Sequence, residues 1–246
     1  MNSHLYPILF GLLSALGNVL GGLLLLVRGK AEHFYLNVLM AVGAGFMLAA
    51  AFLEMIPEAM KLAELAPEFI LLGYLLVHFF SHSIVPHFHF GEETHPHEIG
   101  SHSVGYTVLF GLLVHAFFDG VSIGSSFLVK PSLGMLVFLA VILHKIPEGF
   151  TIGSVMMSTG QSLRVAVGSA IAIGVATMAG VVGTLVWMRM ELGLCLGVSA
   201  GVTLYVASSE LIPIVNQERS PRWALVVFAG IAFFWVTEHL LHAAGF

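Results

Sequence analysis

The chain has 246 residues, of which 58% are hydrophobic and only 9% are charged, and its formal net charge is -5. A soluble domain has roughly 25% charged residues, so this composition excludes a soluble globular protein and indicates an integral membrane protein. Once several spans of about 20 residues are placed, little room is left for a soluble catalytic domain. We expect the lipid bilayer as surroundings and no nucleic acid as a partner.

Apolar runs separated by polar, glycine or proline residues predict an all-α fold of eight transmembrane helices. The first run follows no basic segment and is longer than the core of a secretory signal, so we expect it to be retained. The whole chain, 1–246, then forms a single transmembrane domain. We expect its spans near residues 5–28, 34–60, 67–87, 104–129, 132–158, 163–188, 192–215 and 222–244.

The basic residues of the loops give the expected orientation. With eight spans both termini lie on one side, and alternate loops fall into two sets. The loops opposite the termini hold Arg28, Lys30, Arg164, Arg219 and Arg222, whereas those on the side of the termini hold Lys61, Lys130 and Arg189. Because lysine and arginine favour the cytoplasmic side, we expect a cell membrane protein with both termini extracytoplasmic.

Spans two and seven share a pattern. Residues 44–57 and 200–213 both read Ala-Gly, eight residues, Glu, any residue, Ile, Pro. These two spans run in opposite directions, and repeats of inverted topology are typical of secondary transporters. We interpret Glu54, Glu58 and Glu210 as carboxylates along an ion pathway; the alternative is that they are helix-end acids solvated at the interface.

A histidine-rich loop, 88–103, separates spans three and four. A tract of this kind is typical of loose metal capture. The alternative is a solvated loop whose histidines have no individual role. The candidate residues are His87, His89, His95, His97 and His102.

Spans four and five each contain a histidine and an acid four residues apart, His115 with Asp119 and His144 with Glu148. Residues i and i+4 share a helix face, so each pair offers two ligands. Both histidines are about 22 Å from the turn between the spans, at ~1.5 Å per residue, which places both rings near mid-membrane. Because a carboxylate in a membrane interior costs at least ~2.5 kcal/mol, these acids need partners or a cation.

Two imidazoles with two carboxylates form a nitrogen and oxygen site that suits Zn2+, and also Fe2+, Mn2+, Co2+ or Cd2+. The alternative is that each histidine only hydrogen-bonds its neighbouring acid, without a metal.

The segment HAFFDGVSIG, followed by HKIPEG, resembles the paired fourth- and fifth-helix signatures of the ZIP (Zrt/Irt-like) family of divalent metal transporters. The resemblance implies uptake of zinc or a similar cation into the cytosol by alternating access, through a site formed by the two histidine and acid pairs. It also implies a 3+2+3 arrangement, with helices 1–3 and 6–8 related by a pseudo-two-fold around helices 4–5. A homodimer is a further possibility.

The chain departs from the family pattern at three positions. Many members with a two-metal centre have Asn after the first histidine, Asp or Asn after the second, and an acid in span six. This chain has Ala116, Lys145 and Thr177 there. The amine of Lys145 would repel a second cation and could pair with Asp119 or Glu148. We therefore predict one transport metal.

Two other classes of function compete with uptake. An intramembrane zinc-dependent hydrolase would also place histidine and acid in the membrane, but the HExxH motif is absent. A metal exporter of the cation diffusion type also uses paired histidine and acid ligands, but such proteins usually have six spans. We therefore predict an uptake transporter, which is not an enzyme, and keep the hydrolase and the exporter as alternatives.

The histidine-rich loop gives a first prediction. Deletion of residues 89–100 should change the apparent affinity or regulation of metal uptake but leave transport intact, because the transport ligands lie in spans four and five. Uptake by a folded deletion variant checks this, and complete loss of transport would contradict it.

Overall fold

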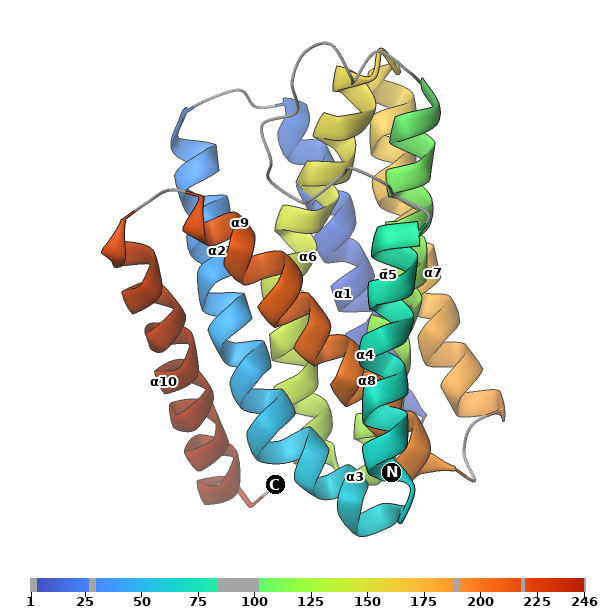
Figure 1. The fold of residues 1–246 in the computed structure, drawn as a ribbon, viewed down its shortest axis with the longest axis vertical. Coiled ribbons are helices and arrows are strands. Elements are labelled where there is room, and N and C mark those ends of the chain that lie inside the picture. Colours follow the sequence, from blue (N-terminus) through green and yellow to red (C-terminus); the bar gives the residue numbers. More distant parts are fainter. Residues whose placement is uncertain (1–3, 27–29, 84–101, 188–190, 218–219, 246) are drawn as a thin grey trace.

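The computed structural model describes residues 4–26, 30–83, 102–187, 191–217 and 220–245. Within these ranges the chain is helical apart from short turns and helix ends (Figure 1). The predicted all-α fold is therefore confirmed for the described residues. Most of the histidine-rich loop, with His89, His95 and His97, lies outside them, and so does the candidate residue His87.

The described chain forms ten α-helices and three short segments of different helical pitch. The helices are α1 (Leu5–Leu23), α2 (Lys30–Ala50), α3 (Ile56–Leu62), α4 (Ala66–Ser83), α5 (His102–Val129), α6 (Pro131–Ser158), α7 (Leu163–Trp187), α8 (Leu192–Tyr205), α9 (Ile212–Asn216) and α10 (Pro221–Ala243). The short segments are the 3-10 turn η1 (Leu24–Leu26) and the π-helices η2 (Ala51–Met55) and η3 (Val206–Leu211).

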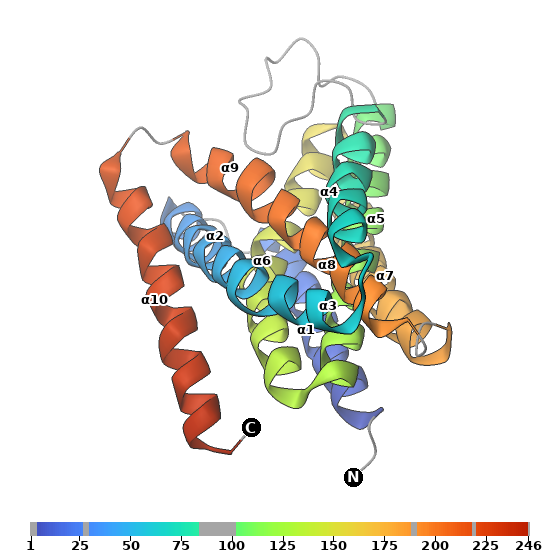
Figure 2. The ribbon, with the colours of Figure 1, turned by 60° about the horizontal axis from the view of Figure 1, so that its bottom comes forward.

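Seven helical segments of the described chain are long and apolar enough to cross a membrane. The remaining expected span corresponds to α4, whose apolar stretch, Ala66–Ser81, is shorter. The observed helices agree with the eight expected spans to within a few residues, so the chain is a multi-pass membrane protein. The start of α1 and the end of α10 lie at the same end of the molecule, as an even number of spans requires (Figures 1 and 2).

The two segments that share a sequence pattern also share a local structure. Each π-helix, η2 and η3, ends just before a short helix with proline at its second position, Pro57 in α3 and Pro213 in α9. Proline has no N–H and its ring clashes with the carbonyl four residues earlier, so the regular hydrogen-bond pattern cannot continue. A π-bulge accommodates the break, and such bulges are frequent at functional sites.

Helices α5 and α6 pack against each other, and α1 and α7 pack against both of them. Helix α10 packs mainly on α2, and α4 mainly on α8. The four helices α1, α5, α6 and α7 thus form a group around the two helices that carry the histidine and acid pairs. The broken helices, α2 to α3 and α8 to α9, cross beside this group (Figure 2).

A glycine directly after each acid allows the closest of these contacts. A Cβ on Gly120 of α5 would overlap the carbonyl oxygen of Thr177 in α7, and one on Gly149 of α6 would overlap that of Asn18 in α1. Small residues let membrane helices approach until their backbones touch. Each acid is therefore held beside a neighbouring helix at a fixed depth.

This packing predicts different outcomes for two glycine substitutions. Gly149→Ala should destabilise the fold by about 1–3 kcal/mol, because the added methyl group forces α1 away from α6. Gly168→Ala, in α7, is the matched control, because a Cβ there meets no atom within 4 Å. Thermal unfolding in detergent checks this, and equal melting temperatures for the two variants would contradict it.

Candidate metal centre

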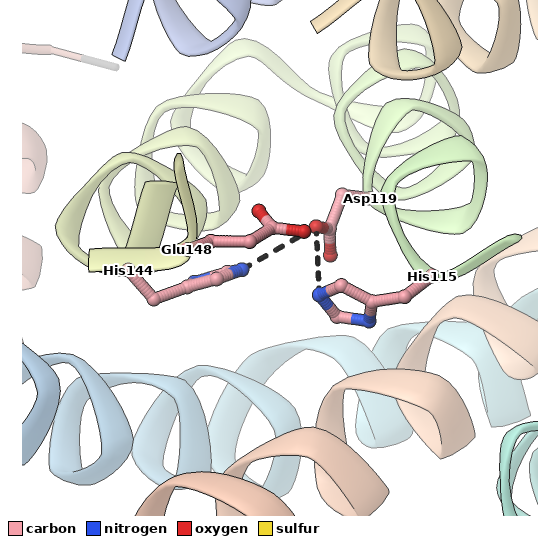
Figure 3. A group of neighbouring side chains, drawn as sticks. All are labelled: His115, Asp119, His144 and Glu148. Atoms are coloured by element: carbon pink, nitrogen blue, oxygen red, sulfur yellow. Dashed lines mark hydrogen bonds and ion pairs between the residues drawn. The ribbon is translucent and has the colours of Figure 1, made fainter. Parts of the chain in front are cut away.

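The two histidine and acid pairs meet in the structure. Their ligand atoms lie within 4.8 Å of one another, and all four residues are buried. Figure 3 shows the side chains of His115 and Asp119 from α5 converging with those of His144 and Glu148 from α6. The helical spacing placed the two residues of each pair on one face, and the packing of α5 on α6 brings the two pairs together.

Both imidazole rings contact the carboxylate of Asp119. One carboxylate oxygen, Oδ2, is 3.1 Å from Nε2 of His115 and 3.3 Å from Nε2 of His144. Nδ1 of His144 lies 3.1 Å from the carbonyl oxygen of Ala140. Because a carbonyl oxygen only accepts, Nδ1 is the nitrogen that donates, and in a neutral ring the lone pair of Nε2 then faces the carboxylate. A cation shared between these atoms would stabilise that arrangement.

Lys145 lies at the centre of this cluster with none of its side chain exposed. Its Nζ is 2.6 Å from Oδ2 of Asp119 and 2.5 Å from Oε2 of Glu148. The sequence suggested that Lys145 could pair with either acid, and the structure pairs it with both. With neutral imidazoles, two carboxylates and one ammonium leave a single net negative charge.

Asn18 of α1 is a site residue that sequence reasoning missed. Its Nδ2 donates to Oε2 of Glu148 at 3.1 Å and to the carbonyl oxygen of Lys145 at 3.3 Å. An asparagine in the middle of the apolar segment SALGNVLGG was the available signal, since such a side chain is costly in a membrane without a partner. Asn18 fixes one oxygen of Glu148 and so orients the carboxylate.

Three buried polar atoms of this cluster have no hydrogen-bond partner among the described residues. They are Oδ1 of Asn18, Nδ1 of His115 and Oε1 of Glu148. Buried polar atoms are rarely left unpaired, and each such case calls for a specific explanation. Oε1 of Glu148 therefore leaves ligand capacity that none of the described residues uses.

A pocket adjoins the cluster on the side that faces the C-terminal end of α6. It is lined by His115, His144 and Glu148 and extends to Glu210 in η3. Oγ of Ser81 in α4 donates to Glu210 at 3.1 Å. The structure thus brings one of the predicted pathway acids, Glu210, to the same pocket as three of the predicted ligands.

Glu54 of η2 and Glu58 of α3 do not line this pocket. They lie beside Lys130, which is in the turn between α5 and α6. Nζ of Lys130 is 2.9 Å from Glu54 and 3.8 Å from Glu58, and Nζ of Lys61 is 3.1 Å from Glu58. Burial lowers the pKa of Lys130, but its hydrogen bond and attraction to Glu54 outweigh this and raise the pKa above its ordinary value. The ammonium group of Lys130 therefore stays charged beside the two acids.

A second group of possible ligands includes Glu54 together with Glu238 and His242 of α10. Both α10 residues lie near the end of the last helix. Their spacing of four residues, the same as in the central pairs, was the available signal. Nothing local in the sequence pointed to Glu54 as their neighbour.

The structure gathers two imidazoles and two carboxylates in a bundle of membrane helices, a ligand set that could hold a divalent metal cation. Comparison with known proteins agrees, since residues 81–238 match the family model described as ZIP zinc transporter. The chain belongs to the ZIP family, whose members are transporters and not enzymes. This excludes the hydrolase alternative.

Individual relatives carry matching names. The chain is 31% identical over 150 residues to "Zinc transporter SLC39A7" of Rattus norvegicus, with 55% of this chain and 32% of the relative covered. It is 30% identical over 134 residues to "Zinc transporter ZIP4" of Homo sapiens, covering 51% and 20%. It is 25% identical over 245 residues to "Zinc transporter YKE4" of Saccharomyces cerevisiae, covering 89% and 67%. The matched region is about a third or less of the length of the mammalian relatives.

The charge balance of the cluster predicts how many ions it binds. One divalent ion changes the net charge from minus one to plus one, whereas two would leave plus three in a buried site, at a high desolvation cost. Purified protein should lose one tightly bound zinc ion on His144→Ala. His239→Ala, at an exposed histidine, is the control and should lose none. Zinc titration checks this, and two tight ions lost together in His144→Ala would contradict it.

Proposed function

We propose that the chain takes up divalent metal ions, zinc above all, into the cytosol through a single site formed by His115, Asp119, His144 and Glu148. The observation that carries the proposal is the buried convergence of these four side chains on one point between α5 and α6. Zinc is the substrate named for the relatives, and the ligand set also suits Fe2+, Mn2+, Co2+ or Cd2+.

Alternating access is the proposed mechanism. The pocket is lined by residues that follow His144 in α6, such as Thr151, and by Leu112, which precedes His115 in α5. It therefore lies on the side of the cluster toward the end of α6, and this end of α6 is opposite the termini (Figure 1). With both termini outside the cell membrane, this pocket faces the cytosol and provides the route by which the ion leaves. Glu210 is then a station on the exit side, and Glu54 and Glu58 are stations on the entrance side. The same geometry run in reverse describes an exporter, which is the alternative.

Lys145 has a defined part in this mechanism. It holds the oxygens of Asp119 and Glu148 that a second cation would need. It also neutralises one of two carboxylates, so the empty and the metal-bound site each carry a single net charge of opposite sign. A site balanced in this way can both accept and release an ion.

We also propose the 3+2+3 arrangement, with 1–246 as a single transport domain. Its support is a reciprocal set of contacts: α1 packs on α6 as α7 packs on α5, and α4 packs on α8 as α10 packs on α2. The glycines of the two Ala-Gly pairs agree with it. Gly45 is seated against the carbonyl oxygen of Val227 in α10, and Gly201 against that of Ile70 in α4. A homodimer and the metal-capturing role of the histidine-rich loop stay predictions.

The test is uptake of several competing metals by reconstituted protein. His115→Ala and Glu148→Gln should each reduce zinc uptake by more than about tenfold, since even residues that support a metal ligand are worth about 10–100-fold in affinity. His239→Ala should leave uptake unchanged, because its ring is exposed and bonded to the carbonyl oxygen of Trp235.

The direction of transport is tested with vesicles in which the protein has one known orientation. Uptake predicts zinc flux from the side of the termini to the side of the pocket. Full zinc flux in both His115→Ala and Glu148→Gln would refute the central site, and flux only in the opposite direction would favour an exporter.

A further inference from the structure

Glu54, Glu238 and His242 form a second cluster at the end of the molecule where the chain termini lie. Glu54 belongs to η2, and the other two residues lie four positions apart on one face of α10. One ligand atom from each residue lies within 4.8 Å of the other two. Side chains from two elements far apart in the sequence thus converge on one point.

We propose that Glu54, Glu238 and His242 form a second divalent-cation site, which captures a zinc-like ion at the outer end of the transport route. The imidazole argues for a borderline cation such as Zn2+ or Cd2+ over Ca2+ or Mg2+, which prefer oxygen ligands throughout. The role in capture rests on the proposed function, whereas the binding of the ion does not.

The burial of the cluster suits a site that binds and releases quickly. The two carboxylates are half-buried and His242 is exposed. Zinc sites with three protein ligands keep a further position for water, which four-ligand structural sites lack. Three ligands at the protein surface therefore fit a transient stop for a partly hydrated ion.

Lys130 acts as an internal competitor for this site. Its Nζ is 2.9 Å from Oε2 of Glu54 and its side chain is 36% exposed. The Glu54 side chain is 13% exposed, but Lys130 reaches solvent, which screens part of its attraction to Glu54. A divalent ion, with twice the charge, can therefore compete with the ammonium group for Glu54. Glu58, 3.8 Å from the same Nζ, is close enough to keep Lys130 when Glu54 is released.

The decisive experiment is titration of purified full-length protein with Zn2+ alone, in a His144→Ala background that removes the central site. The histidine-rich loop is the same in every variant, so its sites cancel in the comparison. Glu238→Gln and His242→Ala should each lose one weakly bound zinc ion relative to this background. His239→Ala is the matched control on the same helix and should lose none, because its ring bonds the carbonyl oxygen of Trp235 at 2.8 Å.

Lys130→Gln provides a test of opposite sign, which holds even if an α10 variant fails to fold. Removal of the competing ammonium should raise the zinc affinity of this site by about fivefold or more, since an exposed ion pair already accounts for up to about fivefold and Glu54 is only 13% exposed. Unchanged zinc binding in Glu238→Gln, His242→Ala and Lys130→Gln would overturn the proposal.

Uptake separates the capture role from the proposed function. In protein with an intact central site, His242→Ala should raise the KM for zinc uptake and leave the maximal rate unchanged. Loss of zinc binding at the outer cluster without any change in KM would leave a binding site and refute capture. Zinc transport that survives His115→Ala would refute the central transport site but not the outer binding site. The zinc titrations of the outer cluster do not depend on transport.

Discussion

The paired contacts of Lys145 with Asp119 and Glu148 are the constraint on which the centre of the protein depends. A single charged group in a membrane interior costs at least about 2.5 kcal/mol, so three of them persist only with close partners. One ammonium between two carboxylates removes most of this cost but leaves one net negative charge. In the proposed mechanism that remaining charge, beside two neutral imidazoles, is what attracts a cation to this point.

Helix packing holds these charges in place. Gly149 follows Glu148 and brings α6 against the backbone of Asn18, whose side chain then donates to the same carboxylate. Gly120 follows Asp119 and brings α5 equally close to α7. In each case the acid offers a carboxylate as a possible metal ligand, and the glycine after it makes the close contact between helices. For this reason a change in packing at either glycine would also change the geometry of the ligands.

Polar groups continue on both sides of the centre. Glu210 and Ser81 lie along the pocket on one side, and Glu54 with its neighbours lies at the opposite end. Glu54 and Glu210 both occur in π-helical segments that proline terminates. The same local break therefore places a carboxylate in each of two helices that a regular α-helix would have aligned differently.

The sequence by itself determined the membrane class, the helix positions and the placement of each histidine and acid pair on one helix face, because hydropathy and the 3.6-residue helical period act over neighbouring residues. It also predicted the repeated Glu and Pro pattern, which became two matching π-helices. Only the tertiary structure decided which oxygens Lys145 bonds, that Asn18 reaches Glu148 from α1, and that Glu54 meets Glu238 and His242. Those contacts join residues from different helices, and their distances depend on how closely the helices pack, which no local pattern specifies.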